Sequence, residues 1–99
     1  MGFFGNLKKI GLINDKISRL EALVEEIRLD FHKRTPQGEI QAKVIHGRFI
    51  LSEIGEIVSS SPRSVFLAPY WLLGNKMELQ QVCSKIAGLL DDAEEINSW

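Results

Sequence analysis

The residues best suited to bind a small molecule lie between Arg63 and Trp71. The adjacent rings of Tyr70 and Trp71 could stack on a planar ligand such as a nucleotide base, and Arg63 or Lys76 could supply a positive charge. Adjacent aromatic residues inside an apolar stretch are, however, more typical of a core or an interface. A small-ligand, nucleotide-like binding or sequestering protein is therefore one alternative function.

Catalytic and metal-binding patterns are weak. The two histidines, His32 and His46, fall on different expected elements, and neither has a ligand partner at the three- or four-residue spacing of helical metal sites. Cys83 lies in an apolar helical pattern, where a free cysteine is usually a small hydrophobic residue. The glycines match no phosphate-binding loop. We predict a protein that is not an enzyme, with no cofactor and no metal.

Length and composition indicate one globular domain covering residues 1–99, with 44% hydrophobic and 25% charged residues. A sequence pI near 6.1 argues against a dedicated nucleic-acid-binding protein. A lone cysteine requires no oxidising compartment, and the chain shows neither a signal peptide nor an apolar run of about 20 residues that could span a membrane. The sequence therefore predicts a cytoplasmic protein.

The first element is a long amphipathic helix. Its apolar residues recur at alternating spacings of three and four, which places them along one seam of a helix. They are Ile10, Ile13, Ile17, Leu20, Val24, Ile27 and Phe31. Asn14 or Asp15 could instead cap a new helix, which would leave residues 1–13 as a separate short amphipathic helix.

A second helix is expected after Thr35 and Pro36, which match an N-cap followed by a first helical residue. Its seam consists of Ile40, Val44, Gly47, Leu51, Ile54 and Val58. Gly47 and Gly55 would weaken the helix, and their usual benefit is the close approach of a neighbouring backbone. Residues 39–50 also alternate polar and apolar at their start, so a hairpin is the alternative there.

A third helix is expected after Asn75, because Asn75 and Glu78 have the spacing of a capping box. Its seam consists of Leu79, Val82, Ile86, Leu89, Ala93 and Ile96. The apolar stretch at residues 65–73 is expected to be a compact connector with single helical turns at Pro62 and Pro69. The predicted fold class is all-α, a small helical bundle of three long helices plus one or two short helical segments.

The N-terminus offers a second kind of contact. In a helix, Phe3, Leu7 and Ile10 would share one face with Phe4 at its edge, while Lys8 and Lys9 would lie elsewhere. This pattern is typical of helices that lie in a membrane interface. A peripheral membrane-surface protein anchored by this helix is the other alternative function, although the same segment could fold onto the bundle.

The main prediction is a small non-enzymatic interaction protein that forms a homo-oligomer or binds another protein. Three apolar seams plus the aromatic connector give a chain of this size more apolar surface than one core can hold, and such surplus surface usually marks an interface. A basic front and an acidic tail would suit antiparallel or head-to-tail packing between chains, although two ordinary solvated faces would give the same pattern. The expected binding residues are Phe3, Phe4, Arg63, Tyr70, Trp71 and Trp99.

Overall fold

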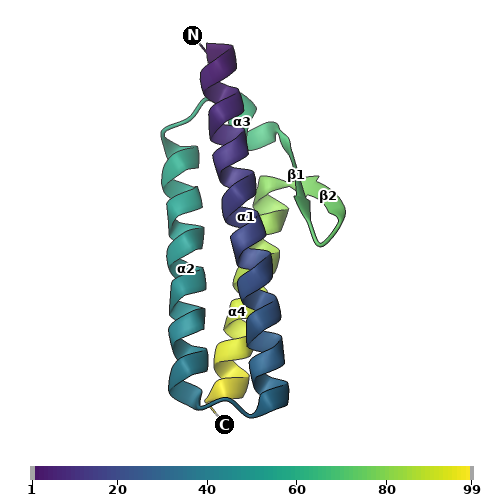
Figure 1. Cartoon of the computed structure of the whole chain (residues 1–99). Coiled ribbons are helices and arrows are strands. Elements are labelled where there is room, and N and C mark those ends of the chain that lie inside the picture. The colour runs from purple at the N-terminus through teal and green to yellow at the C-terminus, as the bar shows by residue number, and fades with distance from the viewer. Residues whose placement is uncertain (1, 99) are drawn as a thin grey trace.

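The computed structural model describes the backbone of residues 2–98 and the side chains of residues 7–98. Three long helices form a bundle, with a small hairpin on one side (Figure 1). In chain order the elements are α1 (Gly2–Lys33), α2 (Gln37–Ser59), α3 (Arg63–Leu67), β1 (Pro69–Leu72), β2 (Asn75–Glu78) and α4 (Leu79–Asn97). The predicted fold class of a mainly α-helical bundle is confirmed, and the hairpin is an addition to it.

Helix α1 is continuous, so the separate short helix considered for residues 1–13 is wrong. Asn14 does not cap a new helix, because its side-chain amide donates to the carbonyl oxygen of Ile10 at 3.1 Å within the same helix. The helix ends where Arg34 takes the left-handed conformation, with φ of 58°. The N–H of Thr35 then donates to the carbonyl of Asp30 at 2.9 Å, which closes the last turn as a Schellman motif.

Residues 39–50 lie entirely within α2, which confirms the helical interpretation and makes the hairpin alternative wrong. Pro36 occupies the N-cap position, whereas the hydroxyl of Thr35 donates to Oδ1 of Asp30 at 3.2 Å instead of capping α2. Gly47 is closely packed, but against side chains rather than the neighbouring backbone that was expected, because a Cβ there would lie 3.0 Å from a methyl carbon of Leu90. Gly55 has no such neighbour.

The stretch expected to be a connector contains a strand. Strands β1 and β2 pair antiparallel, with Leu72 opposite Asn75, so Leu73 and Gly74 form a two-residue turn. Both turn residues have positive φ, 53° and 80°, which is the geometry of a type I′ hairpin turn. The short helix expected at Pro69 is therefore wrong, while the one after Pro62 is present as α3.

Helix α4 begins later than expected, because Asn75 belongs to β2. The capping box is formed by Glu78 and Gln81 rather than by Asn75 and Glu78. The backbone N–H of Glu78 donates to Oε1 of Gln81 at 3.2 Å. The pattern predicted the right kind of cap three residues too early, because the end of the hairpin determines where the helix can start.

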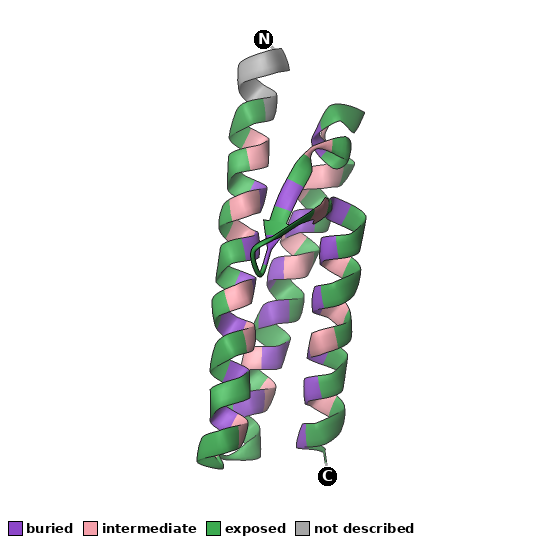
Figure 2. Ribbon diagram, turned by 90° about the vertical axis from the view of Figure 1, so that its right-hand side faces the viewer, coloured by how far each residue is buried: buried purple, intermediate pink, exposed green. Residues whose placement is uncertain are grey.

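The core lies along the line where the three long helices meet. Helix α2 packs along both α1 and α4, whereas α1 and α4 contact each other much less because β1 lies between them (Figure 2). The buried apolar side chains are Ile13, Ile17, Leu20, Leu23, Ile27, Ile40, Val44, Ile50, Ile54, Val65, Tyr70, Leu72, Leu79, Val82, Ile86, Leu90 and Ala93. The hairpin therefore lies between α1 and α4 and covers the upper half of the surface that these two helices form.

Ion pairs join α2 to the other two long helices. Nζ of Lys43 in α2 lies 2.6 Å from Oδ2 of Asp30 in α1, and this ion pair lowers the pKa of the Asp30 carboxyl. Arg48 of α2 donates to Asp91 at 2.8 Å and also pairs with Glu94. The acidic tail thus finds part of its counter-charge within the chain.

Candidate interaction surfaces

The hairpin is fixed to the bundle by Tyr70. Its ring is fully buried, and its hydroxyl donates to the carbonyl oxygen of Val65 at 2.6 Å. Burial raises the pKa of this phenol. Leu72, two positions along the strand, is buried on the same face. Tyr70 was expected to be a contact residue, and that expectation is wrong because the strand turns its side chain into the core.

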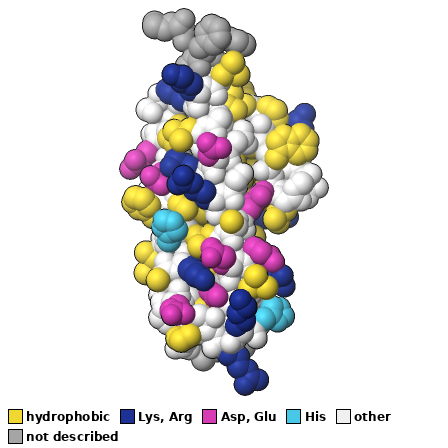
Figure 3. All heavy atoms as spheres, in the orientation of Figure 1, with side chains coloured by type: hydrophobic (Ala, Val, Ile, Leu, Met, Phe, Trp, Pro, Cys, Tyr) yellow, Lys and Arg dark blue, Asp and Glu magenta, His cyan; other side chains and the backbone are white. Residues whose placement is uncertain are grey.

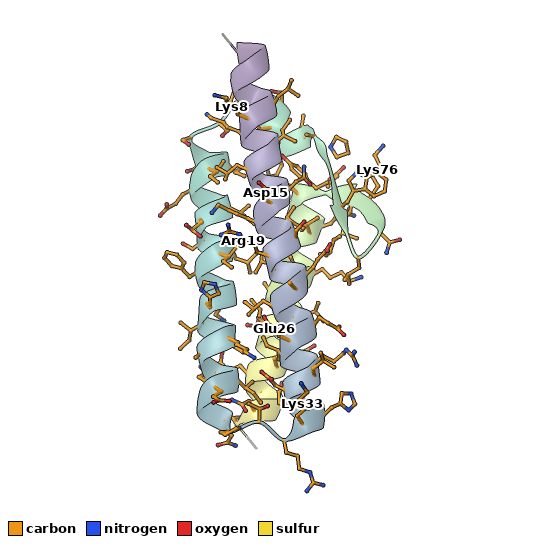
Figure 4. All side chains as sticks on the ribbon, viewed as in Figure 1. Lys8, Asp15, Arg19, Glu26, Lys33 and Lys76 are labelled. Atoms are coloured by element: carbon orange, nitrogen blue, oxygen red, sulfur yellow. The ribbon has the colours of Figure 1, made fainter. Side chains whose placement is uncertain are left out.

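Trp71 lies on the opposite face of β1 and is exposed. Its cross-strand neighbour is Lys76, which points away from the bundle in Figure 4. Arg63 is exposed at the start of α3. Because Tyr70 and Trp71 face opposite sides of the strand, the pair of stacking rings expected for a planar ligand is not formed.

The outer side of this region carries three exposed apolar side chains, Leu67, Trp71 and Leu73, which we call the hairpin surface. Figure 3 shows hydrophobic side chains at the upper right, over the hairpin and next to a basic side chain. Leu73 sits at the tip of the turn, and its backbone N–H donates to Oε1 of Glu21 at 2.8 Å. The tip is thereby held against the middle of α1.

Below the tip, an apolar groove runs between α1 and α4, which we call the α1–α4 groove. Its volume is about 210 Å³. The walls are Val24, Ile27 and Phe31 from α1 and Leu89, Ala93 and Ile96 from α4, with Arg28 and Asp92 among the lining residues. In Figure 2 the lower parts of α1 and α4, which carry these residues, lie beneath the hairpin, with α2 behind them.

Four groove residues were expected to belong to the core. Val24 and Phe31 are in the predicted seam of α1, and Leu89 and Ile96 are in that of α4, yet the first three are only partly buried and Ile96 is 53% exposed. The cause is the hairpin, which holds α1 and α4 apart and covers only the upper part of the space between them. Part of the apolar seams of α1 and α4 is therefore left accessible to solvent.

Phe3, Phe4 and Trp99 were the other expected contact residues. The side chains of Phe3 and Phe4, and the whole of Trp99, lie outside the described residues. Leu7, the next apolar residue along α1, is half exposed, and Lys8 beside it is exposed. Figure 4 places Lys8 near the upper end of α1.

A second apolar groove, of about 490 Å³, lies between α2, α3 and α4. Phe66 and Gly55 line it together with Cys83, and burial raises the pKa of the Cys83 thiol. A raised pKa disfavours the thiolate that a nucleophile needs. Within residues 2–98, no group of three or more His, Cys, Asp or Glu side chains is arranged to hold a metal ion.

The fold and surfaces define a small three-helix bundle with an inserted hairpin and two apolar grooves. Comparison with protein-family models finds no match. Neither the curated proteins nor the solved structures include one that matches this chain. In the part of the chain that the structure describes, none of the helices has the length and apolar character needed to cross a membrane.

Proposed function

We propose that this protein is a small non-enzymatic interaction protein that works as a homo-oligomer. The observation that carries the proposal is the α1–α4 groove, where Val24, Phe31, Leu89 and Ile96 have core-type spacing but are only partly covered by their own chain. Apolar surface of this kind on a small domain favours association with another apolar surface.

The energetic argument follows from surface area. Each Å² of apolar surface removed from water contributes about 25 cal/mol, so covering several large aliphatic side chains is worth several kcal/mol. The helix seams supply rigid, preformed walls, which lowers the entropy cost of association. A cytoplasmic location fits the proposal, because Cys83 is a free thiol in the structure and the sequence requires no disulfide.

Sedimentation velocity of the full chain over a wide concentration range tests the proposal. The expected result is a species of at least twice the 11.2 kDa chain mass, with the monomer appearing on dilution. A monomer at every concentration would refute the homo-oligomer.

The membrane-surface alternative has one specific observation in its favour. The upper end of the bundle combines the half-exposed Leu7 and Leu67 with exposed Lys8 and Arg63. Apolar and basic side chains together suit an anionic lipid surface. Flotation with vesicles of phosphatidylcholine, with and without phosphatidylserine, tests this candidate, and Leu7→Asp together with Leu67→Asp should abolish any binding. No binding to either vesicle would exclude it.

The nucleotide alternative receives no support from the geometry, because the buried Tyr70 cannot stack on a ligand beside Trp71. A thermal-shift screen with nucleotides remains the direct test. A bound nucleotide at a hundred times its dissociation constant would add about 2.7 kcal/mol to the unfolding free energy.

A further inference from the structure

We infer that two copies of the chain close the α1–α4 groove face to face, antiparallel, with α1 of one copy against α1 of the other. This inference rests on the proposed homo-oligomer and names its interface and orientation. A two-fold axis makes such an interface self-complementary, so each copy must offer both halves of every contact. Both the shape and the charges of this face meet that condition.

The hairpin determines the orientation. It covers the upper half of the face whose lower half is the groove (Figure 2). In a parallel pair the two hairpins would meet at the same height and hold the grooves apart. In an antiparallel pair the lower half of each copy lies beneath the hairpin of the other copy, so the two grooves come together.

The lengths agree with this arrangement. The hairpin tip contacts α1 at Glu21, and α1 ends at Lys33, which is about 18 Å further along at 1.5 Å per residue. The α1 wall of the groove, Val24 to Phe31, is centred about midway between these points. A two-fold axis through that centre therefore brings the end of α1 in one copy level with Leu73 in the other.

The charges beside the groove are arranged for the same pairing. Glu21, Glu25, Arg28 and His32 follow each other at spacings of four, three and four, so they form one stripe next to the groove wall. Two such stripes running antiparallel place Glu25 opposite Arg28 of the second copy, and Glu21 opposite His32. The Glu25 carboxylate of each copy then faces the Arg28 guanidinium of the other, which favours this register over its alternatives.

The ion pair that Glu25 and Arg28 form within one chain does not prevent them from pairing with a second copy. Arg28 donates to Glu25 within the same helix, at 3.0 and 2.5 Å, and both side chains are more than half exposed. An exposed pair of this kind contributes little to stability, so the same two groups are free to pair across an interface. Asp92 on the α4 wall adds a carboxylate that also lines the groove with Arg28.

Charge exchange tests the inference. Glu25→Arg and Arg28→Glu should each raise the dissociation constant of the oligomer about tenfold or more, because each places like charges opposite one another. The double variant Glu25→Arg with Arg28→Glu restores both opposite-charge contacts, so it should return to within about threefold of the wild type. Glu56→Arg, on an exposed position of α2 away from the groove, is the matched control and should change nothing.

The outcomes separate this inference from the function on which it rests. A monomeric wild type would refute both. If the wild type is an oligomer and both single variants associate as tightly as it does, the antiparallel α1 interface is refuted and the homo-oligomer stands. The same holds if the double variant has a higher dissociation constant than either single variant. Circular dichroism of each variant shows whether it is folded before its association is measured.

A cross-linking experiment gives an independent answer if any charge variant fails to fold. In a Cys83→Ser background, Arg28→Cys places one thiol per copy close to the two-fold axis, whereas His32→Cys places it far from the axis on the same stripe. Mild oxidation should yield a disulfide-linked dimer with Arg28→Cys and not with His32→Cys. Equal cross-linking of the two variants, or none with Arg28→Cys, would overturn the arrangement.

Discussion

The backbone N–H of Leu73 donates to Oε1 of Glu21 at 2.8 Å, which joins the hairpin tip to the middle of α1. Leu73 has a φ of 53°, a left-handed conformation that costs an L-residue other than glycine about 1–2 kcal/mol. Its side chain is 56% exposed, so burial offsets little of that cost in the single chain. In the antiparallel pair we propose, this side chain faces the end of α1 in the second copy.

Leu73→Asn should raise the free energy of unfolding of the monomer by about 1 kcal/mol, because asparagine tolerates the left-handed conformation and is favoured in type I′ turns. Urea unfolding at a concentration where the chain is monomeric measures the change. Leu67→Asn is the control, since Leu67 is equally exposed, at 58%, but has no positive φ. An unchanged or lower stability of Leu73→Asn would contradict the strain assigned to the turn.

Gly47 and Gly55 provide a matched pair within α2. Gly55→Ala should stabilise the chain by about 1 kcal/mol, because alanine favours a helix and the new Cβ meets no atom within 4 Å. Gly47→Ala should destabilise the chain by about 1–2 kcal/mol even though it gains the same helix propensity. The reason is that its Cβ would crowd Leu90 at 3.0 Å and Leu23 at 3.3 Å.

Thermal and urea unfolding of the two alanine variants should change the unfolding free energy in opposite directions if the side chains of Leu90 and Leu23 pack tightly against Gly47. Stabilisation by both substitutions would show that Leu90 and Leu23 move aside without cost, and would contradict the tight packing at Gly47.

Asp30 should make stability depend on pH. The ion pair with Lys43 favours the carboxylate and lowers the folded-state pKa, so the contribution is present above the ordinary carboxyl pKa of about 3.9. It is lost as the pH falls through the lower, folded-state value. Asp30→Asn should therefore be less stable than the wild type at neutral pH, and the difference should shrink as the solution is acidified.

Unfolding of the wild type, Asp30→Asn, Lys43→Gln and the double variant at pH 7 completes a cycle for this pair. The sum of the stability losses of the two single variants should exceed the loss of the double variant, because either substitution alone removes the same ion pair. If the losses of the single variants add up to that of the double variant, and the stability difference between the wild type and Asp30→Asn does not vary with pH, then the ion pair contributes nothing to stability.

The helices could be predicted because their apolar residues repeat over several turns. Ile13, Ile17 and Leu20 in α1 and Val82 and Ile86 in α4 are buried as the seams require. The hairpin could not be predicted, because its turn has Leu73 at the position before glycine where asparagine or aspartate is the usual signal. Without that signal, a short strand in an apolar run resembles a helical connector.

The candidate site was predicted only in part for the same reason. Trp71 was expected at a contact and is exposed, but the neighbouring Tyr70 is buried, since successive residues of a strand face opposite sides. The groove could not be located from the sequence, because Leu89 and Leu90 both fit a helical seam, and Leu90 is the one that packs against Gly47 of α2 while Leu89 stays partly exposed.

The central claim is that the chain associates through the α1–α4 groove. Light-scattering mass determination of the wild type, Ile96→Glu and Ile45→Glu tests it most directly, because both isoleucines are on helices and are similarly exposed, at 53% and 57%. Ile96 lines the groove, whereas Ile45 is in α2 and is not among the groove residues. We expect an oligomer for the wild type and Ile45→Glu, and the 11.2 kDa monomer for Ile96→Glu. An oligomer that survives Ile96→Glu, or that only Ile45→Glu dissociates, would contradict the claim.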